Sequence, residues 1–206
     1  MQINSRREYN LDSLDFGDLP DTPIEAVEQW LAAASKQPDY NAFHLATSNG
    51  AGHVSGRMVL LKGIEQGKLL FFTDYDSQKG QQINKNKRVA ATFFWPALER
   101  QIRIEGTATF LSVQKSDAYF ESRPRESRAA AAASLQSQRA ESRTDLERRY
   151  EKMMQNSEKI ERPARWGGYG IEPHYIEFWQ GRPSRLNDRI VFEKNRDKWM
   201  RYRLQP

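Results

Sequence analysis

The hydrophobic pattern of residues 22–37, TPIEAVEQWLAAASKQ, has the period of an amphipathic helix. Its apolar positions lie on one stripe at helical spacing, namely Ile24, Val27, Trp30, Leu31 and Ala34. Thr22 has the chemistry of an N-cap, Pro23 suits the first helical position, and Glu25 stands where a capping box has its acidic residue. The segment is therefore predicted to be a helix that packs one face on a core.

From residue 43 to residue 112 the pattern changes to short β-rich runs. The segment 43–64 holds two such runs around SNGAG, which predicts a hairpin. The segment 101–110 alternates, so its two faces differ in polarity, with Ile102, Ile104, Gly106, Ala108 and Phe110 on the apolar one. Further elements predicted here are buried strands at 67–74 and 88–96 and a short polar helix at 77–88. Several antiparallel strands with short turns indicate a barrel or a sandwich.

The pattern becomes helical again after Ser112. The segment 113–123 is predicted to be a helix that ends or kinks at Pro124, because a proline ring cannot continue a helix. The other elements predicted toward the C-terminus are helices at 126–138 and 143–161, a loop at 162–170, and short strands at 174–180, 189–194 and 198–205. The expected fold class is therefore mainly β with flanking helices, α+β.

Composition adds the class of protein. The chain has 206 residues, enough for one core, and its 5 Trp, 8 Tyr and 10 Phe argue against disorder. It has no cysteine, which excludes disulfides, thiolate metal sites and cysteine nucleophiles. No apolar run approaches the ~18 residues that span a bilayer, and no signal peptide is visible, so a cytoplasmic protein is expected.

The charge permits anionic partners. The net charge of +5 comes from 32 Lys and Arg against 27 Asp and Glu, and a nucleic-acid partner does not follow because the acids are spread through the chain. The segment QGRPSRLNDR (180–189) concentrates Arg182, Arg185 and Arg189 beside a tryptophan. These arginines are either solvated charges on a turn or ligands of an anion.

The sequence lacks the common catalytic motifs. Its three histidines do not have the spacing of a metal-ligand pair, so no metal site is predicted. No Walker loop, no GxGxxG after a strand and no G-x-S-x-G elbow is present. Nucleotide-binding and hydrolase functions of the usual kinds therefore have little support.

Three groups of residues suit phosphate. Arg57 and Lys62 flank the run RMVLLK, although residues five apart face opposite sides of a regular strand. Lys79 lies just after Ser77, a candidate cap of a helix whose free N–H groups attract anions. Tyr119 and Arg123 share a helical face, and Ser127 follows four residues later. Each group has an alternative as ordinary surface charge.

Taken together, several segments resemble the pyridoxamine (pyridoxine) 5′-phosphate oxidases. They stand in the order and spacing of that family, over nearly the whole chain, and include RMVLLKG, LLFFTDYDSQKGQQI, LERQ, SRPR, WGGYG and IEFWQGRPSRLNDR. The resemblance implies a flavin-binding split β-barrel, homodimeric, with FMN in clefts at the subunit interface. It also implies a flexible arm or lid at 1–20, an FMN-binding barrel with a helical insertion at 21–160, and a dimerisation and active-site segment at 161–206.

The resemblance carries site residues onto this chain. The implied FMN ligands are Arg57, Lys62, Phe72, Thr73, Gln78, Lys79, Gln101, Gln136, Ser137, Trp179 and Arg189. The implied substrate ligands are Lys62, Tyr119, Arg123, Ser127, Arg185 and Asn187, with the last two as the catalytic pair and Arg182 as a surface residue. The implied reaction oxidises pyridoxamine or pyridoxine 5′-phosphate to pyridoxal 5′-phosphate, with O2 as acceptor and H2O2 and ammonia as by-products.

Two departures from the family pattern leave alternatives open. Asn187 stands where the family usually has a histidine, and asparagine cannot titrate near neutrality. Gln78 replaces a common arginine, which removes one charge-assisted contact. The alternatives are a related flavoprotein oxidase that acts on another reduced ring of the phenazine type, and a non-catalytic protein that binds FMN or pyridoxal phosphate. A nucleic-acid-binding module has only the net charge in its favour.

Overall fold

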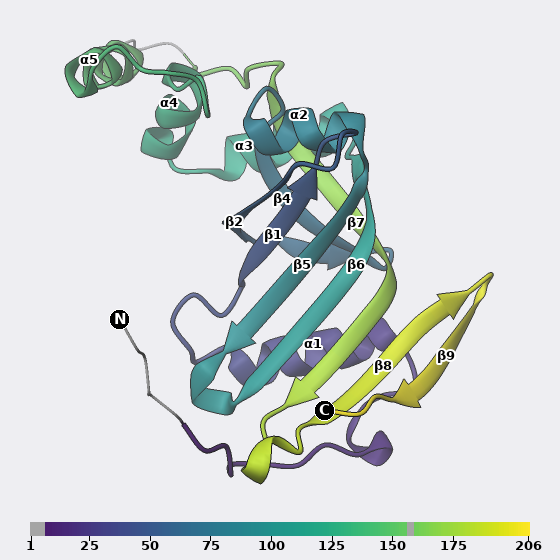
Figure 1. Ribbon diagram of the computed structural model, residues 1–206. Coiled ribbons are helices and arrows are strands. Elements are labelled where there is room, and N and C mark those ends of the chain that lie inside the picture. The colour runs from purple at the N-terminus through teal and green to yellow at the C-terminus, as the bar shows by residue number, and fades with distance from the viewer. Residues whose placement is uncertain (1–6, 156–158) are drawn as a thin grey trace.

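The computed structural model describes residues 7–155 and 159–206, whose strands form one antiparallel sheet that curls into a half-barrel (Figure 1). The main strand order is β2-β1-β5-β6-β7-β4-β3, and β8 and β9 extend the sheet from β7. The strands are β1 (Ala42–Ser48), β2 (Val54–Leu60), β3 (Gly63–Glu65), β4 (Lys68–Asp74), β5 (Arg88–Trp95), β6 (Arg100–Phe110), β7 (Trp166–Gln180), β8 (Asp188–Asn195) and β9 (Lys198–Arg203). The predicted fold class and its antiparallel hairpins are confirmed.

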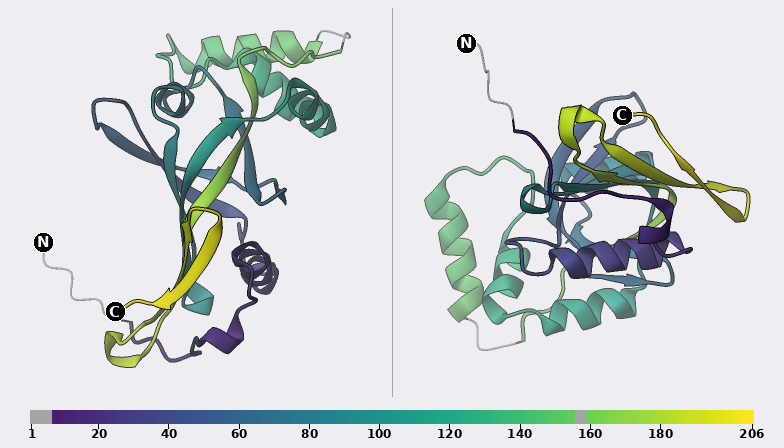
Figure 2. Two further views of the ribbon diagram at one scale, coloured as in Figure 1. Left: turned by 90° about the vertical axis from the view of Figure 1, so that its right-hand side faces the viewer. Right: turned by 90° about the horizontal axis from the view of Figure 1, so that it is seen from below.

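The predicted helices also form. They are α1 (Pro23–Ala34), α2 (Gln78–Lys85), α3 (Val113–Ser122), α4 (Arg125–Ala133) and α5 (Arg143–Gln155), with 3-10 turns η1 (Phe16–Asp18), η2 (Pro96–Leu98) and η3 (Pro183–Arg185). Helix α1 packs on the sheet (Figure 2). The Trp30 ring of this helix meets the Phe178 ring edge-on, with 5.1 Å between centroids. Helices α4 and α5 lie together beyond α3, at the end of the molecule away from α1. No helix of the described residues is long and apolar enough to cross a membrane.

The core follows the alternation of the strands. On β6, Ile102, Ile104 and Ala108 are buried, whereas their polar neighbours face outward. Phe110 continues the apolar face but lies at the strand end, where it is 54% exposed and stacks on Tyr169. The alternating pattern of β6 therefore identifies the side chains that face the inside of the barrel. Phe110, the last residue of the strand, lies at the rim.

The predicted loop at 162–170 is wrong in its second half, because residues 166–170 are the start of β7. The glycines that suggest a loop are needed for close packing instead. A Cβ atom on Gly167 would lie 2.0 Å from the Tyr75 hydroxyl oxygen, and one on Gly168 would lie 2.5 Å from a methyl carbon of Leu111. This part of β7 passes directly beneath neighbouring side chains, between β4 and β6.

The described part of the predicted N-terminal arm, from residue 7 on, is anchored to the barrel. The backbone N–H groups of Asn10 and Leu11 donate to the buried carboxylate of Glu99 at 2.8 and 3.0 Å. Leu14 and Leu19 are buried in the core. Residues 1–6 lie outside the described residues, as do residues 156–158 of the helix predicted at 143–161. A lid function of the arm stays a prediction.

Candidate functional site

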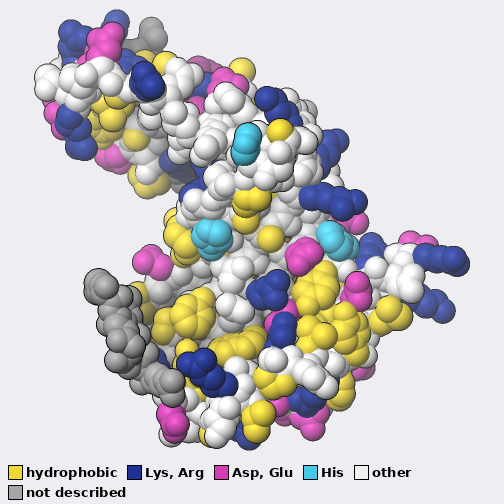
Figure 3. All heavy atoms as spheres, in the orientation of Figure 1, with side chains coloured by type: hydrophobic (Ala, Val, Ile, Leu, Met, Phe, Trp, Pro, Cys, Tyr) yellow, Lys and Arg dark blue, Asp and Glu magenta, His cyan; other side chains and the backbone are white. Residues whose placement is uncertain are grey.

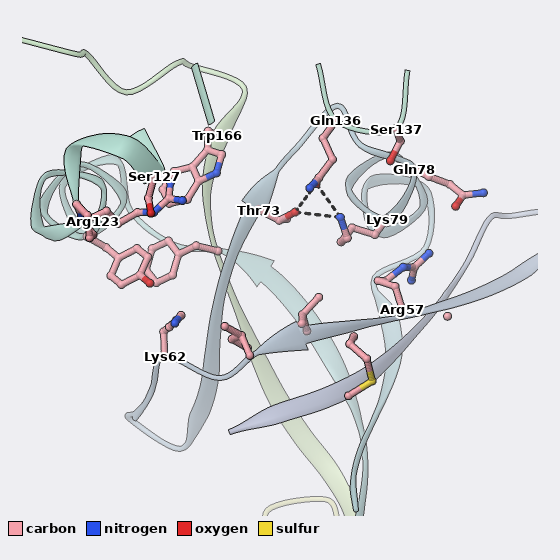
Figure 4. Close-up of a pocket in the computed structure, with 17 residues that line it drawn as sticks. Arg57, Lys62, Thr73, Gln78, Lys79, Arg123, Ser127, Gln136, Ser137 and Trp166 are labelled. Carbon is pink, nitrogen blue, oxygen red and sulfur yellow. Dashed lines mark hydrogen bonds between the residues drawn. The ribbon is translucent and has the colours of Figure 1, made fainter. Parts of the chain in front are cut away.

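A cleft of about 760 Å³ lies between β2, β4 and the helices α2, α3 and α4 (Figure 4). It brings together eleven of the predicted site residues: Arg57, Lys62, Phe72, Thr73, Gln78, Lys79, Tyr119, Arg123, Ser127, Gln136 and Ser137. Figure 4 shows them in two groups, with Lys79 and Gln136 on one side of the cleft and Arg123 and Ser127 on the other. The structure thus joins segments that are up to 80 residues apart in the chain, from Arg57 to Ser137 (137 − 57 = 80).

The first group is built at the start of α2. Ser77 caps this helix as predicted, since its hydroxyl accepts from the Gly80 N–H at 3.3 Å. Lys79 is only 8% exposed, and its ammonium donates to the Thr73 hydroxyl at 3.1 Å and to Gln136 Oε1 at 2.8 Å. A buried ammonium at a helix N-terminus, surrounded by neutral oxygens, is suited to an anion.

The electrostatics of this group favour a negative ligand. Burial, together with the nearby positive charge of Arg57, lowers the pKa of Lys79 from 10.5 to about 8, although Asp74 opposes the shift. Burial also lowers the pKa of the Arg57 guanidinium. Lys79 and Arg57 repel each other, and an anion bound between them would compensate both positive charges. A phosphate group is such an anion.

Arg57 is held by a polar network that the sequence did not reveal. Its guanidinium donates to the Thr47 hydroxyl at 2.6 Å, to the Ser55 hydroxyl at 2.6 Å and to the Leu45 carbonyl at 3.0 Å. Gln82 of α2 in turn accepts from Thr47 and Ser55 at 2.5 and 2.7 Å. The pairing of β1 with β2 places Thr47 opposite Ser55, and the contact between α2 and β1 adds Gln82, which no spacing in the sequence indicates.

Arg57 and Lys62 both line the cleft, contrary to the expectation for two residues five apart on one strand. Strand β2 ends at Leu60, and the chain then turns so that the Lys62 N–H donates to the Leu70 carbonyl at 2.8 Å. The alternation of side chains stops with the strand, so Lys62 is free to face the same cleft as Arg57.

The second group is an aromatic shelf with a guanidinium on it. The rings of Phe72 and Tyr119 stack at 3.8 Å between centroids, and the Tyr119 and Trp166 planes are 5° apart. Arg123 lies over the Trp166 ring, 4.7 Å from its centroid. Tyr119, Arg123 and Ser127 line the same cleft, although α3 ends at Ser122 and Arg123 follows it with an extended backbone, outside the predicted helical face. Trp166 was missed because the glycines beside it suggested a loop.

Arg123 has an unused donor. Burial lowers the pKa of its guanidinium, although Tyr119 opposes the shift, and within residues 7–155 and 159–206 the buried Nη1 atom has no hydrogen-bond partner. A buried donor without a partner is costly, and a charged one more so. The Tyr119 and Ser127 hydroxyls beside it would complete a set of donors for phosphate oxygens.

The remaining predicted residues lie elsewhere in the chain. Gln101, Trp179 and Arg189 form one row across three strands, because Trp179 is directly opposite Gln101 on β6 and Arg189 on β8. Arg185 and Asn187 follow in the loop after β7, beside Tyr9 in a separate pocket. Strand β7 begins in the cleft at Trp166 and runs 15 residues to Gln180, roughly 45 Å along the strand. One copy of the chain therefore does not bring the two sets together.

The loop that carries Arg185 has an unusual backbone. Ser184 and Arg185 both have positive φ, 56° and 62°, in the left-handed region that costs non-glycine residues free energy. The Asn187 side-chain oxygen accepts from the Arg182 N–H at 3.0 Å and so closes the loop. Arg182, expected as a surface residue, forms an ion pair with Asp188 at 3.4 Å and donates to the Asp12 carbonyl at 2.9 Å.

Arg189 is paired with a buried carboxylate, Glu177. The Arg189 guanidinium donates to the two Glu177 oxygens at 2.8 and 3.0 Å, and Arg103 and Tyr175 donate to the same group at 3.0 Å each. Burial alone would raise the pKa of Glu177, but the bonds from Arg189 and Tyr175 outweigh it and lower the pKa. No spacing in the sequence indicates this pairing, because Glu177 and Arg189 meet only through the pairing of β7 with β8.

We expect Glu177→Gln to lower the free energy of unfolding by about 2 kcal/mol, because charge-assisted bonds in a buried site are lost. The ionised carboxylate stabilises the fold above the unfolded pKa, and that stability is lost as pH falls below about 4.5 through the lowered folded pKa. Urea denaturation at pH 7 and pH 4 measures both effects. Glu172→Gln, an exposed carboxylate on the same strand, is the matched control, and an equal loss in both variants contradicts the prediction.

Apolar side chains are exposed near both sets of residues. On β2, Met58 is 62% exposed, and on β5, Phe94 is 50% exposed directly opposite Gln101. Figure 3, in the orientation of Figure 1, shows hydrophobic side chains gathered on the lower half of the visible face, over the sheet. Exposed apolar area of this kind beside charged clusters is typical of a surface that another protein chain covers.

Two family models match the chain. The one described as pyridoxamine 5′-phosphate oxidase matches residues 27–156, and the one described as pyridoxine 5′-phosphate oxidase C-terminal dimerisation region matches residues 166–206. The second match covers Trp166, Trp179, Arg189 and the loop that carries Arg185.

Relatives agree along almost the full length. A pyridoxine/pyridoxamine 5′-phosphate oxidase of Cytophaga hutchinsonii is 46% identical over 207 residues, which cover 98% of this chain and 96% of the relative. One of Leptospira biflexa is 46% identical over 188 residues, 89% of each chain.

Among solved structures, PhzG from Burkholderia lata in complex with tetrahydrophenazine-1-carboxylic acid has a TM-score of 0.91 at 29% identity, over 95% of this chain and 99% of that one. A pyridoxamine 5′-phosphate oxidase-related, FMN binding protein from Nostoc punctiforme has a TM-score of 0.74 at 17% identity, over 91% of this chain and 100% of that one, which supports the fold alone. The half-barrel, the two matched regions and the full-length relatives agree, and the chain belongs to the pyridoxamine 5′-phosphate oxidase family of oxidoreductases.

Proposed function

We propose that the protein binds FMN and oxidises pyridoxamine or pyridoxine 5′-phosphate to pyridoxal 5′-phosphate, with O2 as the acceptor. The observation that carries this proposal is that one cleft holds two separate groups of hydrogen-bond donors suited to phosphate. Lys79 and Arg57 form one group, and Arg123 with Tyr119 and Ser127 forms the other. A flavin phosphate and a substrate phosphate would each need such a group, and an aromatic shelf lies beside the second one.

The donor set fits FMN. In this proposal Arg57, Lys79, Gln136 and Ser137 hold the phosphate of FMN, because they combine two desolvated cations with neutral polar groups. Gln78 lines the same side of the cleft, as a neutral ligand in the position of a common arginine. Thr73 belongs to this phosphate side through its hydrogen bonds with Lys79 and Gln136, and Lys62 and Phe72 would face the ring system.

The substrate would lie on the other side, with its phosphate on Arg123, Tyr119 and Ser127. The unpaired Nη1 atom of Arg123 would then gain an anionic partner. Arg185 and Asn187 would come from a second copy of the chain, together with Gln101, Trp179 and Arg189, since in one copy they are at the far end of β7. The dimerisation region and the exposed Met58 and Phe94 support this homodimeric site.

The chain's own contribution to the reaction is to bind and orient. When bound, FMN supplies the redox chemistry, which is acceptance of a hydride equivalent and its delivery to O2 as H2O2. The phosphate donors fix both rings at their polar ends, which holds the substrate C4′ carbon in a productive position. Pyridoxine phosphate would yield the aldehyde directly, and pyridoxamine phosphate would consume one water and release ammonia. None of these steps needs an activated nucleophile, so the role of Arg185 and Asn187 would be to orient the substrate ring.

The visible spectrum tests this function. The purified protein, reconstituted with FMN and freed of oxygen, should lose its flavin absorption near 450 nm, roughly the usual band of oxidised flavin, when pyridoxine 5′-phosphate is added. Readmission of air should restore the band and produce H2O2. Tight binding of flavin with no bleaching by either phosphate ester would instead indicate a non-catalytic carrier.

We expect FMN affinity to fall as pH rises above about 8, since the Lys79 ammonium then loses its proton in the ligand-free protein. Fluorescence titration with FMN should give a Kd about ten-fold weaker at pH 9.5 than at pH 7. Without ligand the sign reverses, because an unfolded lysine holds its proton up to 10.5, so unfolding stability rises from pH 8 toward pH 10. In Lys79→Arg the charge persists up to high pH, so a Kd that still rises about ten-fold between pH 7 and pH 9.5 would contradict the assignment.

The likeness to PhzG favours a second candidate, oxidation of a reduced phenazine precursor. That protein is described in complex with tetrahydrophenazine-1-carboxylic acid, and it matches nearly the whole of this chain. The substrates differ in their anion, since one bears a phosphate and the other a carboxylate. Steady-state oxidation of pyridoxine 5′-phosphate and of a dihydrophenazine carboxylate, compared at equal concentration, separates the two functions. The three donors around Arg123 favour the phosphate.

A further inference from the structure

Arg165, which lies just before β7, makes an unusual set of contacts. Its Nη2 atom donates to three backbone carbonyls, those of Ala131, Ala132 and Ser134, at 3.2, 3.0 and 2.9 Å. Its Nε atom donates to the carboxylate of Asp74 at 2.9 Å, and Asp74 is only 4% exposed. One guanidinium therefore ties the C-terminal end of α4 to the end of β4.

These two ends carry the anion group of the cleft. Asp74 directly follows Thr73, and the loop after α4 carries Gln136 and Ser137. The Thr73 hydroxyl donates to Gln136 Oε1 at 3.0 Å, and Lys79 donates to the same oxygen at 2.8 Å. Gln136 and Ser137 are exposed, and Ser137 has a left-handed backbone with φ of 71°. A strained, exposed loop needs an external tie to keep one position.

We propose that Arg165 is a positioning residue for the phosphate group of the flavin. It touches no ligand itself, and it holds Gln136 and Ser137 against Lys79 by fixing the carbonyls at the root of their loop. This inference rests on the proposed function, because it assigns that side of the cleft to flavin phosphate. An arginine is required, since a lysine has no planar fork that can meet a carboxylate and three carbonyls in the directions observed.

The test compares FMN with riboflavin, which has the same ring system and lacks the phosphate. Dissociation constants of both flavins are measured by fluorescence titration for the wild type, Arg165→Ala, Arg165→Lys and Asp74→Asn. Arg143→Ala, whose side chain is 83% exposed on α5, is the matched control. We expect Arg165→Ala and Arg165→Lys to weaken FMN by about ten-fold, the equivalent of one charge-assisted bond, and riboflavin by less than about two-fold.

Each outcome has one meaning. A selective loss of FMN affinity supports the positioning role, because a general structural defect would lower the affinity for both flavins. If the wild type prefers FMN and the Arg165 variants retain the same preference, the inference fails and the proposed function stands. If the wild type binds both flavins equally, the assignment of flavin phosphate to this group fails, and the inference falls with it. Should Arg165→Ala not fold, the ratio in Arg165→Lys and Asp74→Asn decides.

Discussion

Replacing Arg123 by alanine is expected to lower kcat/KM for pyridoxine 5′-phosphate by about 100-fold or more. Two charge-assisted bonds to the substrate phosphate would be lost, each contributing about 1.5–3 kcal/mol. The guanidinium lies over Trp166 and its buried Nη1 atom has no partner among the described residues, so in the proposed site the substrate phosphate is its partner. Initial rates of H2O2 production over a range of substrate concentrations measure the effect.

The control for Arg123 is a substrate without phosphate. Unphosphorylated pyridoxine makes no use of this group, so wild type and Arg123→Ala should oxidise it at similar low efficiency. Arg148→Ala, a 77% exposed arginine on α5, should leave both substrates unchanged. If Arg123→Ala slowed pyridoxine and its phosphate equally, the residue would be supporting the fold of the cleft and not binding phosphate.

The second large effect is expected for Arg185→Ala. This substitution should lower turnover by about 100-fold, as misplacement of a reacting group commonly does, while the Kd for FMN changes less than two-fold. The physical reason is that Arg185 would orient the substrate and would not hold the FMN phosphate, since it lies in the loop after β7, away from Lys79 and Arg57. Single-turnover reduction of the flavin without oxygen isolates the affected step.

The flavin content of purified Arg185→Ala shows whether Arg185 also helps to hold FMN. Equal loss of FMN and turnover would mean that the loop of Arg185 also holds the cofactor. Asn187→Ala should resemble a mild form of Arg185→Ala, because its amide oxygen closes the same loop on the Arg182 N–H. The structure thus gives Asn187 a backbone contact that does not depend on titration, beside the substrate role that the family resemblance implies.

Patterns of local period in the sequence predicted most of the fold. Helix α1 follows from the stripe of Ile24, Val27 and Trp30, and the inner face of β6 follows from strict alternation at Ile102 and Ile104. The start of β7 was missed, because its glycines are typical of loops and only the neighbouring Tyr75 and Leu111 side chains explain them. At these glycines the secondary structure depends on contacts with residues that are far away in the sequence.

Local patterns also indicated some residues of the candidate site and missed others. The cap at Ser77 pointed to Lys79, and Tyr119 and Arg123 line one cleft even though Arg123 lies just past the end of α3. Alternation misjudged Arg57 and Lys62, because the strand ends between them. Trp166, Gln82 and Arg165 support the ligands from other elements, so nothing in their local sequence indicates a role. The assignment of Arg185 and Asn187 to the same site came from family resemblance, and one chain does not bring them to the cleft.

In the proposed dimer two copies of the chain complete one site, with Arg123 from one copy and Arg185 from the other. A mixed dimer of Arg123→Ala and Arg185→Ala, isolated with two different affinity tags, tests it directly. One of its two sites would carry both substitutions and the other neither, so about half of the wild-type activity should return. A mixed dimer as inactive as either parent would contradict the claim and place both residues in the site of a single chain.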